Sequence, residues 1–174
     1  MQIPKKLPQF NKYPALFISS GEYESSLYLA LNGKLMLEKS IKMAPREEAK
    51  EKQGFIGMKG GRYGLAAVSH HGAYVEDLKK KFKTSVHTAV HDILAAQNIK
   101  EIFIFAPTYV SRRIMDGLDK SEQKKVMMKF NCEIIKLNPL EMVKIFWREA
   151  ELAIASKIEL GDEENKILKR PRVK

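Results

Sequence analysis

A glycine-rich segment with two cationic side chains is the stretch of this sequence best suited to binding chemistry. Residues 54–64 (GFIGMKGGRYG) hold five of the ten glycines of the chain, together with Lys59, Arg62 and Tyr63. Glycine lets the backbone adopt positive φ and lets another molecule approach closely. Lysine and arginine attract anions, and an aromatic side chain beside them can stack on an unpaired base. The segment therefore predicts a loop that binds an anionic partner.

The spacing of this loop does not match the common phosphate-binding motifs. A Walker A loop ends in Gly-Lys-Ser/Thr, and no hydroxyl residue follows Lys59. A dinucleotide fingerprint needs a strand directly before it and a helix directly after it, and the flanking sequence favours neither. Residues 57–60 (GMKG) match the GXXG clamp of KH domains, although the order of the surrounding elements differs. A charged surface loop without a ligand stays an alternative interpretation.

Two histidines one helical turn apart could supply part of a metal site. These are His87 and His91, and a zincin would carry glutamate after the first of them, where this chain has Thr88. No third ligand is evident from the sequence, although His70 and His71 are available. We interpret the pair as solvated histidines and predict no metal and no cofactor. A nuclease of the ribonuclease H type is not expected either, because its magnesium needs an acid within the first strand, and residues 13–20 (YPALFISS) contain none.

Composition favours a single basic domain. The chain has 174 residues and a formal net charge of +10, which suits a nucleic acid, an RNA-rich particle or an anionic membrane surface, or reflects solubility alone. Cys132 is the only cysteine, so no intramolecular disulfide forms, which suits a reducing compartment. The sequence shows neither a signal-peptide core nor an apolar run of about 18 residues. We therefore expect a cytoplasmic protein without a membrane segment.

Three strands are predicted before the glycine-rich loop. They cover residues 13–20, 22–31 and 34–43, and the Asn32-Gly33 pair between the last two is typical of a type I′ hairpin turn. Alternation along the third strand directs Leu35 and Leu37 inward. Residues 1–12 are interpreted as an N-terminal arm, residues 13–158 as one domain and residues 159–174 as a basic flexible tail.

The elements after the loop alternate between helix and strand. A long helix is predicted over residues 72–98, with an apolar stripe and an opposite basic face formed by Lys80, Lys83, His87 and His91. A strand (99–106), two helices (108–116 and 121–129), a strand (130–137) and a last helix (140–157) follow. The fold class is α/β (α+β), with helices packed on a mixed β-sheet. The order βββ-α-β-α-α-β-α is that of ribonuclease-H-like folds.

With these elements placed, residues 13–146 resemble a known family. The motifs are FIFAPTYVSRRIMDGL (103–118), CEIIKLNPLEMVKIF (132–146) and the helix YVEDLKKKF (74–82). They are similar to the bacterial relatives of the middle domain of archaeo-eukaryotic peptide-chain release factors, a group that includes the host-attachment protein family. In the release factors, a Gly-Gly-Gln loop between the third strand and the first long helix promotes peptidyl-tRNA hydrolysis on the ribosome. The matching position here reads Gly60-Gly61-Arg62.

The resemblance implies a protein that binds the ribosome or tRNA and acts in codon-independent ribosome rescue. Gly60, Gly61 and Arg62 would be the catalytic residues. The RNA-binding residues would be Lys59, Arg62, Tyr63, Lys80, Lys83, His87 and His91. Because arginine replaces the glutamine, the chain is either a peptidyl-tRNA hydrolase or a non-catalytic module that binds nucleic acid or protein. An enzyme that uses the histidines with a metal is a third possibility, and the oligomeric state is left open.

Overall fold

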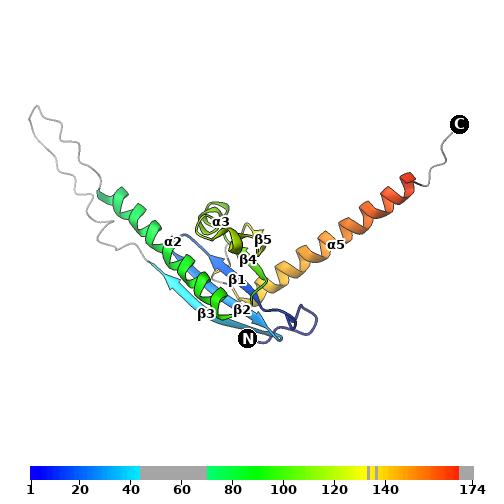
Figure 1. Ribbon diagram of the computed structural model, residues 1–174, viewed down its shortest axis with the longest axis horizontal. Helices are drawn as coiled ribbons and strands as arrows, with labels where there is room; N and C mark the ends of the chain where they lie inside the picture. Colours follow the sequence, from blue (N-terminus) through cyan, green and yellow to red (C-terminus); the bar gives the residue numbers. More distant parts are fainter. Residues whose placement is uncertain (44–69, 133, 136, 169–174) are drawn as a thin grey trace, which may run out of the picture.

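The computed structural model describes residues 1–43, 70–132, 134–135 and 137–168 (Figure 1). The strands and helices follow one another as β1 (Ala15–Ser20), β2 (Glu24–Leu31), β3 (Lys34–Lys42), α2 (His70–Ala96), β4 (Glu101–Phe105), α3 (Thr108–Met115), α4 (Lys120–Gln123), β5 (Val126–Phe130) and α5 (Leu140–Leu168). The predicted element order is therefore confirmed.

The strands form one mixed sheet with the order β3-β2-β1-β4-β5. β1 pairs antiparallel with β2, and β2 pairs antiparallel with β3, as expected for a meander. β4 lies parallel to β1 on its other side, and β5 lies parallel to β4. The predicted mixed sheet with packed helices is thus confirmed, and β1 is its central strand.

Helices cover both faces of the sheet. All six residues of β1 are buried, and they alternate between the two sides as a pleated strand requires. Leu16 and Ile18 pack in a core formed with α2 and α3, whereas Phe17 packs in a second core on the opposite face. That second core includes the first two turns of α5, where the Phe146 ring lies 4.4 Å from that of Phe103. The rest of α5 extends away from the sheet (Figure 1).

The predicted hairpin turn between β2 and β3 is confirmed in its backbone. Asn32 and Gly33 have φ of 49° and 70°, the positive values that a type I′ turn needs at both central positions. The N-terminal residues pack against this turn, because Ile3 N–H donates to Gly33 O at 2.7 Å and Gly33 N–H donates to Gln9 O at 2.7 Å. Ile3 is buried in the core on the α5 side.

The expected inward position of Leu37 is wrong, because its side chain is exposed although it lies on the same side of β3 as Leu35. A β-bulge after Leu37 then changes which residues of β3 face each core. Tyr28 lies opposite Leu37 and Leu27 lies opposite Lys39, so Glu38 has no partner of its own on β2. Beyond this extra residue the alternation of β3 is reversed. Leu35 therefore joins the core on the α5 side while Ile41 joins the core on the α2 side. Leu37 stays 55% exposed on the edge strand.

The segment between α3 and α5 also differs from the sequence-based expectation. The predicted helix 121–129 and strand 130–137 are replaced by the short α4 and by β5, which ends at Phe130. β5 is only half-buried on alternate residues, and its apolar residues 126–128 (VMM) fall within the stretch that was predicted as helix. Ile134 instead packs on the sheet from an irregular segment. α5 continues to Leu168, beyond the predicted end at residue 157.

None of the helices, within the residues that the structure describes, is long and apolar enough to cross a membrane. The division of the chain into arm, domain and tail stays a prediction.

We expect Gly33→Ala to destabilise the fold by about 1–2 kcal/mol, the cost of a left-handed backbone for a residue with a Cβ. The new Cβ would also lie 2.5 Å from Gln9 Oε1, so the Gln9 side chain would have to move. Urea unfolding measures the loss. Gly72→Ala is the matched control, because a Cβ there has open space in α2; it should be neutral or stabilising by up to about 1 kcal/mol. Equal effects of the two substitutions would contradict this account of the turn.

Candidate functional site

The glycine-rich loop predicted as the centre of the site lies outside the described residues. Lys59, Gly60, Gly61, Arg62 and Tyr63 all fall in the interval between the end of β3 and the start of α2. Their predicted roles are therefore argued from the sequence alone. The remaining site residues lie on α2, and the structure gives their surroundings.

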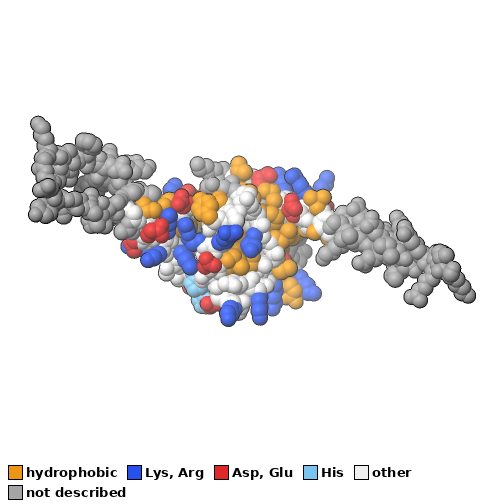
Figure 2. Space-filling view, turned by 90° about the horizontal axis from the view of Figure 1, so that it is seen from above, with side chains coloured by type: hydrophobic (Ala, Val, Ile, Leu, Met, Phe, Trp, Pro, Cys, Tyr) orange, Lys and Arg blue, Asp and Glu red, His pale blue; other side chains and the backbone are white. Residues whose placement is uncertain are grey.

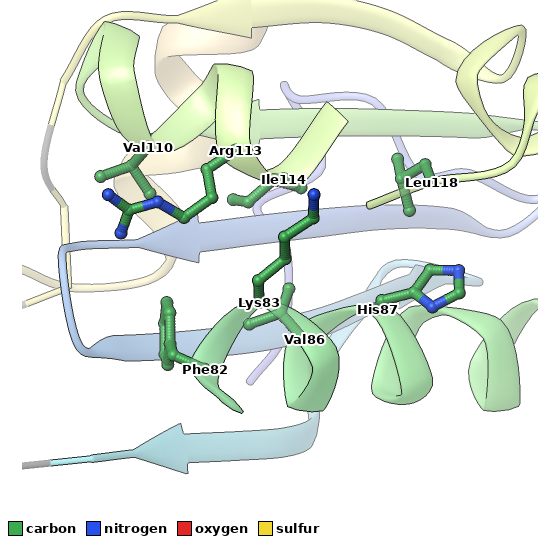
Figure 3. A pocket seen from close by; sticks show the side chains of 8 residues that line it. All are labelled: Phe82, Lys83, Val86, His87, Val110, Arg113, Ile114 and Leu118. Atoms are coloured by element: carbon green, nitrogen blue, oxygen red, sulfur yellow. The ribbon is translucent and has the colours of Figure 1, made fainter. Parts of the chain in front are cut away.

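The four predicted RNA-binding residues of α2 do not share one surface environment. Lys80 is exposed, whereas Lys83 and His87 are only partly exposed. These two line a small pocket between α2 and α3 (Figure 3), together with Phe82, Val86, Val110, Arg113, Ile114 and Leu118. Arg113 comes from the facing helix α3, and its Nη1 atom is buried without a hydrogen-bond partner among the described residues. The pocket is thus lined by three nitrogen-bearing side chains, whose end groups point in different directions (Figure 3).

His87 and His91 both lie beside a carboxylate that the sequence analysis did not single out. Glu122 of α4 is only 5% exposed. Its Oε1 accepts a hydrogen bond from His91 Nδ1 at 3.1 Å, and its Oε2 lies 3.7 Å from His87 Nε2. The two imidazole rings are 6.3 Å apart, one turn along α2. His91 remains mostly exposed while it contacts this carboxylate, whereas His87 is partly buried.

The position of Glu122 is set by the start of α4. Asp119 is the N-cap of this helix, and its side chain accepts a hydrogen bond from the backbone of the third helical residue, which is Glu122. In return, the Glu122 Oε2 atom accepts a hydrogen bond from the Asp119 backbone N–H at 2.9 Å. This reciprocal arrangement is a capping box. It holds the carboxylate against α2 although the helix has only four residues.

The environment of Glu122 favours its ionised form. Burial raises the pKa of the carboxyl, but the Asp119 N–H, the hydrogen bond to His91 and the charges of the two histidines outweigh it. The net pKa of Glu122 therefore lies below its ordinary value. An ionised carboxylate next to two imidazoles can hold a proton between them or bind a cation.

The charge on the visible surface is distributed rather than gathered. Figure 2 shows lysine and arginine side chains across the whole of one face, with aspartate and glutamate between them. Two α2 lysines have acidic partners, in the pairs Lys79–Glu76 at 3.0 Å and Lys81–Asp77 at 2.8 Å. Lys80 lies between these pairs in the sequence and, with His91, is an exposed member of the predicted α2 RNA-binding residues.

A signal for Asp119 and Glu122 was present in the sequence. Asp119-Lys-Ser-Glu122 has the N-cap and N3 residue types of a capping box, but the predicted helix was started at residue 121. The contact of Glu122 with α2 carries no local signal, because His91 precedes it by 31 positions.

The comparisons with known proteins identify similar structures at low sequence identity. No protein-family model and no curated protein matches the chain. The archaeal translation termination factor aRF1 is 13% identical with a TM-score of 0.46, over 87% of this chain and 42% of that one. S. cerevisiae Dom34, a translation termination-like factor involved in RNA quality control pathways and interacting with Hbs1, is 10% identical with a TM-score of 0.43, over 90% and 42%. The chain thus spans about two fifths of the length of these structures.

We expect Glu122→Ala to destabilise the fold by about 1–3 kcal/mol, because the Asp119 N–H and His91 would lose their acceptor in partly buried hydrogen bonds. Glu122→Gln should lower the free energy of unfolding by less, since an amide oxygen can still accept from the Asp119 N–H. This variant shows the effect of losing the negative charge alone. Chemical denaturation measures both values. If Glu122→Ala were as stable as the unmodified chain, the network would be incidental to the fold.

Proposed function

We propose that this chain binds the ribosome or tRNA in a release-factor-like role, with residues 59–63 as its contact with RNA. The observation that carries the proposal is the place of Gly60-Gly61-Arg62 in the chain. The tripeptide falls between the third strand and the first long helix of a mixed sheet, which is the interval where the resembled family carries Gly-Gly-Gln. A net charge of +10 adds long-range attraction to RNA phosphates.

The α2 side chains are expected to contribute unequally to RNA binding, because their surroundings differ. Lys80 is exposed and can reach a phosphate without rearrangement. Lys83 and His87 line the pocket between α2 and α3, and His91 contacts Glu122. We therefore assign the α2 part of the RNA contact to Lys80 and give the other three a smaller share.

We expect Arg62→Ala to weaken cosedimentation with ribosomes several-fold and to lower the slope of log affinity against log salt by about one, as for one lost phosphate contact. Lys80→Ala should weaken binding more than Lys83→Ala does. Arg148→Ala is the matched control, because Arg148 is an exposed arginine on α5, the helix that packs on the opposite face of the sheet.

Binding that does not depend on salt would contradict an RNA contact. An Arg148→Ala effect as large as that of Arg62→Ala would indicate non-specific attraction by the net charge and would likewise contradict a contact at the loop.

The finer proposal is peptide release by codon-independent hydrolysis of peptidyl-tRNA. Two glycines are retained at the matching position, and the backbone of the third residue can still help to orient a water molecule. A second candidate is a non-catalytic RNA-binding module, which the replacement of glutamine by Arg62 favours, since a guanidinium suits phosphate geometry.

A release assay on stalled ribosomes separates these two candidates. If the chain is a hydrolase, we expect release of the nascent peptide, with a loss of at least about tenfold in Gly61→Ala, because a Cβ would obstruct close approach of the backbone. Ribosome binding is measured in parallel for the unmodified chain and for Gly61→Ala. Binding without release by the unmodified chain would exclude the hydrolase and leave the module.

A further inference from the structure

Three side chains with metal-binding atoms converge where α2 meets the start of α4. They are His87, Asp119 and Glu122, and one ligand atom from each lies within 4.8 Å of the others. His87 comes from α2, Asp119 is the N-cap of α4, and Glu122 lies in its first turn. The three residues thus join two elements that are connected in the chain through β4 and α3.

The Nε2 atom of His87 is the feature that needs a partner. It is buried and has no hydrogen-bond partner among the described residues. The nearest acidic oxygen with which it pairs, Oε2 of Glu122, is 3.7 Å away, which is too far for a hydrogen bond. Burying a polar atom without a partner costs about 1–3 kcal/mol. A cation between this nitrogen and the two carboxylates would satisfy the imidazole and the negative charge together.

The donor set indicates which cation fits. One imidazole nitrogen with two carboxylate oxygens suits Zn²⁺ and related divalent transition metals, whereas Ca²⁺ and Mg²⁺ prefer oxygen alone. Tetrahedral zinc with ligands at about 2.0–2.1 Å places those ligands about 3.3 Å apart. The 3.7 Å between His87 and Glu122 is therefore only slightly wider than a zinc site requires. Small side-chain rotations would bring the His87 and Glu122 atoms to the distance that zinc requires.

The surrounding hydrogen bonds hold the Glu122 carboxylate as metal ligands usually are held. Glu122 Oε2 accepts the backbone N–H of Asp119 at 2.9 Å, and Glu122 Oε1 accepts Nδ1–H of His91 at 3.1 Å. Such outer contacts orient ligands and tune their affinity. His91 is 61% exposed and acts here through Glu122.

We propose that His87, Asp119 and Glu122 bind one divalent transition-metal ion, with Zn²⁺ as the ion that the donor set favours and with His91 as a positioning residue. Three protein ligands leave a fourth position for water. The ion would link α2 to α4 and so hold His87, which lines the α2–α3 pocket, in one position. This site does not use the glycine-rich loop or Lys80, which carry most of the proposed RNA contact.

The test is metal titration of the full chain after treatment with EDTA. Zn²⁺ is titrated in competition with a chromogenic chelator, and Co²⁺ is titrated by its visible absorbance, which reports the coordination geometry. We expect one ion per chain. His87→Ala and Glu122→Gln should each lower the affinity by more than about 100-fold, and His91→Ala by about 10–100-fold, the usual effect of losing an outer partner. Zn²⁺ should raise the Tm of the unmodified chain and leave that of His87→Ala unchanged.

Two controls keep the result specific. Asp92→Asn removes a negative charge on α2 next to His91, but Asp92 is exposed and pairs with Lys39 at 3.6 Å, so the affinity should not change. His71 lies about 24 Å along α2 from His87, and His71→Ala should also leave it unchanged. Absence of zinc binding by the unmodified chain would overturn the proposal. Binding that survives both His87→Ala and Glu122→Gln, or that is lost in His71→Ala, would overturn it as well.

Discussion

The burial of β1 on both faces is the constraint on which the rest of the structure depends. All six of its residues are buried, so each side of the sheet has to be covered by helices. α2 and α3 cover one side, and the start of α5 covers the other. β1 also changes the direction of pairing within the sheet, since its neighbours are the antiparallel β2 and the parallel β4. The positions of α2, α3 and the start of α5 follow from this one strand.

The candidate sites occupy one side of that arrangement. α2 begins after the glycine-rich interval and then crosses the sheet on the side shared with α3 (Figure 1). Its apolar stripe fixes the rotation of the helix, because Phe82, Val86 and Ala89 are buried. With this rotation set, Lys83 and His87 face α3 and α4 rather than open solvent. The same packing that forms the core therefore decides which cations of α2 are available to a partner.

Local signals predicted much of the fold, and long-range packing decided the remainder. Asn32-Gly33 identified its turn because the required positive φ is a property of those two residues. β5 was missed because its membership of the sheet depends on pairing with β4, which its own sequence does not encode. The β-bulge at Glu38, which places Leu35 and Ile41 in cores on opposite faces, has no local signal either. For the site, the histidine spacing was visible, but the approach of Glu122 to α2 was not.

The edge of the sheet formed by β3 has a further consequence for the behaviour of the protein in concentrated solution. An exposed edge strand is a template for pairing with another chain and so for aggregation. Here Gln2 forms a bridge with Lys34 at the start of the strand, and Glu38 interrupts the regular pairing in its middle. Lys39 and Lys42 add charge beyond that point. The strand therefore offers no long, flat and uncharged stretch to a second molecule, which disfavours growth of the sheet from one chain to the next.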